Sequence, residues 1–262
     1  MSGSMRKTSG NTALMPGAIS GRPPRSGPAR AIFELTKFHL SLYIGLSAVA
    51  GHGLAQDHVS AASLILGIWT VLLASGSAVL NNIQDREYDS RFERTRSRVL
   101  ACNHFSLAAA RCLALALILI GLAGLSVGYT SVWPAVFGAI ALICYNGLYT
   151  PLKKTHPLLA MLPGTLCGMI PPAMGWAAAP GPLSGTDLTG LIILMVCLGI
   201  WQWPHTMLVA ARQISKYGES NRFLGRWSPL ERHFQILIWT LLFSLAMGLF
   251  LVHGWIVEAW IA

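Results

Sequence analysis

Acidic and amide side chains recur at intervals of four in the stretch that follows the second long apolar segment. Asn81, Asp85, Asp89 and Glu93 keep this spacing, which places them on one face of a helix with a drift of about 40° per step. Carboxylate and amide oxygens are ligands that Mg²⁺ prefers, and phosphate oxygens complete its shell. The pattern predicts a metal and phosphate site at a helix end. The alternative is a charged loop whose acids pair with neighbouring arginines.

Basic side chains lie near this stretch in the sequence or on the same predicted side of the membrane. Arg94 and Arg98 follow the acids directly, and a guanidinium offers two parallel hydrogen bonds to a phosphate. Lys153 and Lys154 follow Tyr149 closely at the end of a later apolar segment. Near a carboxylate-bound metal, these lysines would stabilise the charge that develops on a diphosphate leaving group. The alternative for the two lysines is membrane anchoring without chemistry.

The elements that must position these side chains are membrane helices. Of 262 residues, 53% are hydrophobic and 11% charged, and the mean hydropathy is +0.54. Soluble domains carry about 25% charged residues, so this composition all but excludes one. Since a helix crosses a bilayer with about 20 apolar residues, the stretches without charged side chains hold seven spans, at 38–56, 58–84, 112–152 (two spans), 155–186, 188–211 and 233–257. The expected fold class is an all-α transmembrane bundle.

The basic residues predict the topology of this bundle. All 19 lysines and arginines precede the first span or lie between spans two and three, four and five, and six and seven. The other loops have none. By the positive-inside rule, the N-terminus is cytoplasmic and the C-terminus lies outside. The net charge of +9 is therefore a topology signal, and we expect the lipid bilayer, and no nucleic acid, as a partner.

Residues 1–30 are predicted to be a disordered basic tail, followed by a transmembrane domain at 31–262. The tail is rich in Gly, Ser, Pro and Arg and contains no acidic residue, a composition that is typical of disorder. A mitochondrial transit peptide is the alternative, but four prolines would break its amphipathic helix. We therefore expect a multi-pass protein of the bacterial inner membrane rather than of the mitochondrial inner membrane.

These motifs together resemble the UbiA superfamily of intramembrane prenyltransferases. The run Asn-x-x-x-Asp-x-x-x-Asp at 81–89, followed by Arg-Thr-x-x-Arg, is similar to the first Asp-rich motif of that superfamily. Four further segments, in order along the chain, resemble its haem branch, protoheme IX farnesyltransferase. They are Leu-Thr-Lys at 35–37, Leu-Tyr-Thr-Pro-Leu-Lys-Lys-Thr at 148–155, Gly-x-x-x-Gly-x-x-Pro-Pro-x-x-Gly-Trp at 164–176 and Trp-Gln-Trp-Pro-His at 201–205.

The resemblance implies a UbiA-like bundle around a membrane-facing cavity. It implies transfer of farnesyl from farnesyl diphosphate to protoheme IX (haem B), which gives haem O, with Mg²⁺ assisting the departure of diphosphate. The expected metal ligands are Asn81, Asp85 and Asp89. The candidate catalytic residues are Asp85, Asp89, Tyr149 and Lys153. The candidate substrate-binding residues are Asn81, Arg94, Arg98, Lys154, Trp201, His205 and Lys216.

The second Asp-rich motif of the superfamily is degraded here. Ser215 and Lys216 stand where aspartates are expected, and Glu219 is the nearby acid. Lys216 would contact the diphosphate as a cation in place of a second metal. The resemblance also implies nine spans where seven are predicted. Whether the second metal site exists therefore stays open.

Three alternatives also stay open. His205 follows a proline inside span six, and it contacts either the tetrapyrrole or a neighbouring helix. In a second hypothesis, a prenyltransferase of the same fold uses a quinone-type aromatic compound as its acceptor. In a third, the protein is a non-enzymatic haem- or isoprenoid-binding protein of oxidase assembly, with cytochrome oxidase assembly factors as partners.

Overall fold

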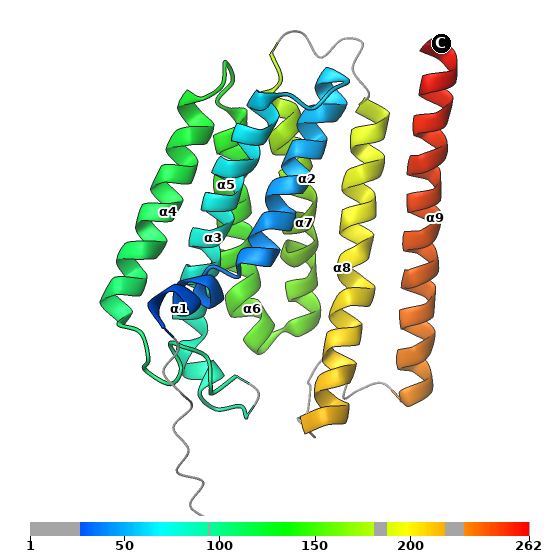
Figure 1. Cartoon of the computed structure of the whole chain (residues 1–262). Coiled ribbons are helices and arrows are strands. Elements are labelled where there is room, and N and C mark those ends of the chain that lie inside the picture. Colours follow the sequence, from blue (N-terminus) through cyan, green and yellow to red (C-terminus); the bar gives the residue numbers. More distant parts are fainter. Residues whose placement is uncertain (1–26, 94, 181–187, 218–227, 262) are drawn as a thin grey trace, which may run out of the picture.

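Among the residues that the computed structural model describes, seven helices are long and apolar enough to cross a membrane, as the sequence predicts, and they form a bundle (Figure 1). The structure describes residues 27–93, 95–180, 188–217 and 228–261, and these contain no strand. Six spans are the helices α2 (Phe38–Gln56), α3 (Ala61–Asp89), α4 (Leu107–Val127), α7 (Pro157–Ala178), α8 (Leu188–Tyr217) and α9 (Pro229–Ile261). The fourth span is composite: α5 (Trp133–Leu142), the π-helix η1 (Ile143–Tyr149) and α6 (Thr150–Thr155).

A short helix, α1 (Pro28–Leu35), lies at the end of the bundle where α3 ends (Figure 1). The expected boundary between tail and domain, at residue 31, therefore falls inside a helix, while residues 1–26 lie outside the described part. Lys37 separates α1 from α2 with a left-handed backbone, at φ 46°. The described basic loops lie at this same end of the bundle. That this end is cytoplasmic stays a prediction.

Helices α2 and α7 are held together by small residues. A Cβ at Gly51 would overlap the carbonyl oxygen of Pro172, and one at Gly175 would overlap that of Ala48. Lipid tails are as apolar as leucine side chains, so membrane helices associate through such close backbone packing rather than through hydrophobic burial. These two glycines explain why α2 lies beside α7, although α3 to α6 separate them in the sequence.

The apolar core lies among α2, α3, α4, α5 and α7, with Leu66, Leu73, Leu125 and Met174 at its centre. Among the described helices, α9 packs against α8 alone, and leucines cover much of its exposed surface. Such a surface suits contact with lipid tails. Buried polar residues of α3, η1 and α6 lie near the end of the bundle at which α1 lies, and they include Asn81, Asp85, Asp89, Asn146 and Thr150.

Candidate active site

Three polar residues near the end of α3 are buried on one helix face. Asn81, Asp85 and Asp89 are only 1%, 2% and 6% exposed, and α3 continues to Asp89, as the spacing predicts. Glu93 does not share this face: its side chain is 72% exposed and lies 3.8 Å from Arg96. The prediction of one helix face is therefore wrong for Glu93, because the helix ends before that position.

Both buried carboxylates carry basic partners. Lys153 Nζ donates to Asp85 Oδ2 at 2.5 Å, and Lys154 Nζ lies 3.0 Å from Asp85 Oδ1. Arg98 Nη1 donates to Asp89 Oδ2 at 2.6 Å. Tertiary structure thus brings together the two predicted motifs, which are far apart in the sequence. We call these five residues the charged cluster; their roles in binding and catalysis stay predictions.

Asn81 connects a further cation, Lys37, to the charged cluster. Lys37 Nζ donates to Asn81 Oδ1 at 2.7 Å, while Asn81 Nδ2 donates to Asp85 Oδ2 and to Thr150 Oγ1, both at 3.0 Å. Within the described residues no carboxylate forms an ion pair with Lys37. Burial lowers the pKa of this ammonium to about 8, and nearby basic groups such as Lys153 act in the same direction.

A π-helix directs two tyrosines toward the charged cluster. Tyr145 and Tyr149 of η1 stack with ring centroids 5.4 Å apart and an interplanar angle of 13°, since residues four apart lie on the same side of a helix. Lys153 Nζ lies 5.5 Å from the centroid of the Tyr149 ring. Tyr145 OH also lies 3.5 Å from Lys37 Nζ.

Hydrogen bonds fasten η1 to α3. Ser77 Oγ donates to Asn146 Oδ1 at 2.6 Å, and Asn146 Nδ2 donates to the Ser77 carbonyl at 3.0 Å. Gln84 Nε2 donates to the Asn146 carbonyl at 3.0 Å. Because Gln84 immediately precedes Asp85, these bonds set the position of Tyr149 relative to the carboxylate.

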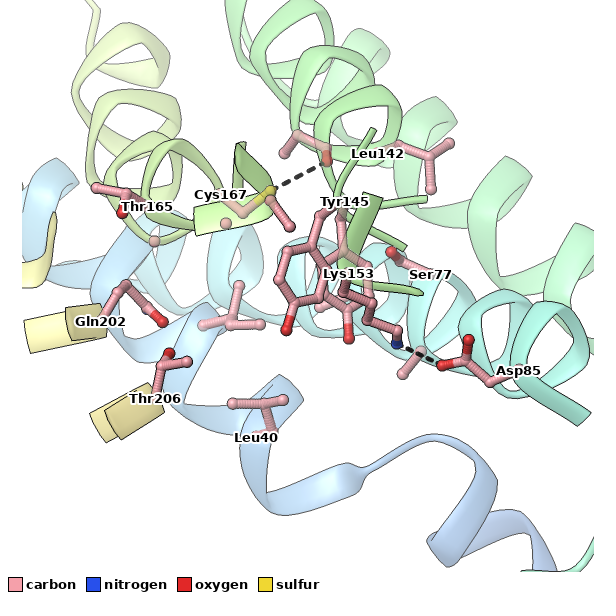
Figure 2. Close-up of a pocket in the computed structure, with 18 of the residues that line it drawn as sticks. Leu40, Ser77, Asp85, Leu142, Tyr145, Lys153, Thr165, Cys167, Gln202 and Thr206 are labelled. Carbon is pink, nitrogen blue, oxygen red and sulfur yellow. Dashed lines mark hydrogen bonds and ion pairs between the residues drawn. The ribbon is translucent and has the colours of Figure 1, made fainter. Parts of the chain in front are cut away.

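A cavity of about 950 Å³ lies beside the charged cluster (Figure 2). All five residues of the cluster line one part of it, and both stacked tyrosines contribute to its wall. Apolar side chains from the bundle, such as Leu40, Ile44 and Met174, line much of the remainder. The volume is near the upper end of the range for ligand sites, about 300–1000 Å³. Such a cavity suits a ligand with an anionic head and an apolar chain.

The two candidate residues of span six lie differently. His205 lines the cavity. Trp201 stacks on the His205 ring, with centroids 5.8 Å apart, and contacts Phe243 of α9 at 5.2 Å. The structure therefore brings His205 to the cavity wall and Trp201 between α8 and α9, where 42% of it is exposed. Their contacts with substrate stay predictions.

Two further candidates cannot be placed in the site. Arg94 lies outside the described residues. Lys216 belongs to the last turn of α8, but its side chain is outside the described part, as is that of Ser215. Glu219 also lies outside it. The role of Lys216 therefore stays a prediction, and the existence of a second metal site stays open.

Sequence reasoning did not single out Lys37 or Tyr145 as site residues. Lys37 had one signal, its place in the Leu-Thr-Lys segment at 35–37. Tyr145 also had one, its position four residues before Tyr149, which places both rings on the same side of a helix.

The donor set fits one Mg²⁺ that binds together with a phosphate ligand. Mg²⁺ commonly takes one or two carboxylates, substrate phosphates and water. Asp85 and Asp89 supply two carboxylates; the buried Asp85 Oδ1 accepts no hydrogen bond, although the Lys154 ammonium lies 3.0 Å from it. The described residues contain no group of three His, Cys, Asp or Glu side chains that could hold a metal. Asn81 Oδ1 accepts a hydrogen bond from Lys37, and its second lone pair could still reach a metal.

Comparisons with known sequences find relatives of this chain. A model described as the UbiA prenyltransferase family matches residues 42–262. The protoheme IX farnesyltransferase of Oleidesulfovibrio alaskensis is 31% identical over 235 residues, which cover 87% of this chain and 80% of that protein. The protoheme IX farnesyltransferase of Geobacter sulfurreducens is 35% identical over 208 residues, which cover 76% of this chain and 73% of that protein.

Two solved structures share the fold. A digeranylgeranylglyceryl phosphate synthase superposes with a TM-score of 0.64 at 16% identity, over 86% of this chain and 78% of that chain. A UbiA homologue from Archaeoglobus fulgidus, bound to GPP and Mg²⁺, superposes with a TM-score of 0.63 at 11% identity, over 85% and 78% of the two chains. At these identities the likeness shows the fold alone.

Proposed function

Because this chain belongs to the UbiA prenyltransferase family, we propose that it transfers the farnesyl group of farnesyl diphosphate to protoheme IX and so makes haem O. One observation carries the proposal. Two buried carboxylates and three basic side chains meet beside a large cavity with extensive apolar lining, inside a membrane bundle. The charged cluster suits a diphosphate head, and the apolar walls suit a farnesyl chain. The similarity to bacterial protoheme IX farnesyltransferases supports the acceptor and a place in the bacterial inner membrane.

The charged cluster would hold the diphosphate and its metal. Asp85 and Asp89 would bind Mg²⁺, which supplies Lewis-acid stabilisation of the leaving group when bound. Lys153, Lys154 and Arg98 would then move from the carboxylates to phosphate oxygens, where they neutralise the charge that develops as the C–O bond breaks. The electron pair of that bond leaves with diphosphate, and an allylic cation remains.

The stacked tyrosines would shield this cation. Their ring faces attract positive charge, and their bulk excludes water from the donor carbon. The vinyl group of the acceptor then attacks the allylic carbon to form the new C–C bond. Water adds to the resulting carbocation and loses a proton, which gives the hydroxyethylfarnesyl side chain.

The test is product analysis with the purified protein in detergent. We expect haem B, farnesyl diphosphate and Mg²⁺ to give a haem whose mass has increased by one farnesyl group and one hydroxyl group. The Asp85→Asn/Asp89→Asn double variant is the inactive control. Diphosphate release with a quinone-type acceptor but not with haem would contradict the proposed acceptor. If diphosphate is released neither with haem nor with a quinone-type acceptor, the transfer itself is contradicted.

A further inference from the structure

On another part of the cavity wall, polar side chains lack hydrogen-bond partners. Thr165 of α7 and Gln202 and Thr206 of α8 line the cavity. Figure 2 shows them across the tyrosine rings from Lys153 and Asp85, with their oxygen atoms directed inward. Among the described residues none of the three side chains has a hydrogen-bond partner, and Thr165 Oγ1 is buried. We call these three residues the neutral patch.

Small residues on the two helices create the space for this patch. A Cβ at Gly168 would lie 2.7 Å from Gln202 Nε2, so the absence of a side chain there admits the amide. A Cβ at Gly199 would lie 2.9 Å from Met169 Sδ and 3.3 Å from Thr165 Cγ2, so the absence of a side chain there admits both residues of α7. Gln202 and Thr206 are one turn apart and share a face of α8. The facing surfaces of α7 and α8 are thus shaped around these polar groups.

Polar groups without partners are costly within a membrane span. They are typically found where they face a cavity, a ligand or one another. The farnesyl chain is a hydrocarbon and offers them no hydrogen bond. The diphosphate is matched by the charged cluster, which lies across the tyrosines from the patch. The neutral patch therefore indicates a second ligand with hydrogen-bonding groups of its own.

We propose that the neutral patch binds the carboxyl groups of the tetrapyrrole acceptor; this inference rests on the proposed function. An amide and two hydroxyls both donate and accept, so they suit a carboxyl group in either protonation state. Because they carry no charge, they do not compete with the charged cluster for the diphosphate. Anchored there, the acceptor extends its vinyl-bearing edge toward the tyrosines and the donor carbon.

The experiment compares haem with its dimethyl ester, in which both carboxyl groups are blocked. Binding to the full chain in detergent is followed through the Soret absorption. Gln202→Met keeps the length of the side chain without its hydrogen bonds, and Thr165→Val keeps the shape of the threonine. We expect each to weaken the binding of haem about tenfold or more. We expect each to weaken the binding of the dimethyl ester less, because the ester carbonyls still accept hydrogen bonds but carry no charge.

The control is Thr240→Val on α9, whose hydroxyl donates to the Ile236 carbonyl outside the cavity; it should bind both haems normally. The inference is overturned if Gln202→Met and Thr165→Val bind haem as tightly as the wild type. It is equally overturned if the affinity of these variants for the dimethyl ester falls as much as their affinity for haem, or if they lose affinity for farnesyl diphosphate. A wild-type protein that binds farnesyl diphosphate but no haem would overturn the proposed function as well.

Discussion

At the scale of single residues, the lysines on Asp85 occupy the oxygens that a metal needs. Lys153 and Lys154 each approach one oxygen of this carboxylate, so Mg²⁺ must displace a cation to bind there. The prediction is that Lys153→Met binds Mn²⁺, a spectroscopic substitute for Mg²⁺, about tenfold more tightly in the absence of diphosphate. It should bind farnesyl diphosphate more weakly. Electron paramagnetic resonance of free Mn²⁺ measures the first effect.

The matched control for this prediction is Arg86→Gln. Arg86 bonds to Asn103 and does not line the cavity, so its loss removes one positive charge from the same end of the bundle without touching Asp85. Equal Mn²⁺ affinity in Lys153→Met and wild type would show that lysine and metal do not compete for this carboxylate.

The carboxylates themselves allow a second prediction at this scale. Asp85→Asn and Asp89→Asn each remove one charge with almost no change of shape. We expect each to reduce Mg²⁺-dependent binding of farnesyl diphosphate at least tenfold, as measured by equilibrium binding in detergent. Glu93→Gln is the control, because Glu93 has the same spacing in the sequence but is exposed. An equal loss in all three variants would indicate a general charge effect rather than a site.

At the scale of elements, the π-helix η1 sets which side chains of the fourth span reach the site. Deleting the exposed Gly147 shortens η1 by one residue, and we expect the segment to relax toward an α-helix. Tyr145 and Asn146 would then rotate relative to Lys153 by about 100°. The variant should insert in the membrane but fail to bind farnesyl diphosphate, which the same binding assay measures.

Gly147→Ala is the control for the deletion, because it changes the residue at this position and keeps the number of residues in η1. A Cβ there meets only Ile143 Cγ2, at 3.7 Å, so the substitution leaves η1 intact. We expect it to bind farnesyl diphosphate as the wild type does. Normal binding by the deletion variant would show that the π-helix does not position the site.

At the scale of the whole molecule, the side on which the charged cluster lies follows from the topology. The described basic loops and the cluster lie at one end of the bundle, which the positive-inside rule places in the cytoplasm. A reporter fused after Ala262 should therefore be active outside the cytoplasm, and one inserted between α8 and α9 should be cytoplasmic. Two cytoplasmic reporters, or the reverse pattern, would contradict the predicted orientation.

The sequence by itself determined the membrane class, the seven spans and the helical spacing of Asn81, Asp85 and Asp89. These features are local: apolar length decides whether a helix spans a bilayer, and a helical repeat of 3.6 residues decides which side chains share a face. The same local reasoning was wrong at Glu93, since spacing does not say where a helix ends.

Only the tertiary structure decided which residues meet. The ion pairs between Asp85 and two lysines of the fourth span, and the bond from Lys37 to Asn81, join distant segments. Tyr145 stacks on Tyr149 within a π-helix that Ser77 and Gln84 of α3 hold in place through Asn146. The neutral patch likewise depends on Gly168 of one helix facing Gln202 of another. Contacts of this kind depend on how helices pack, and packing depends on pairs of surfaces that no single stretch of sequence contains.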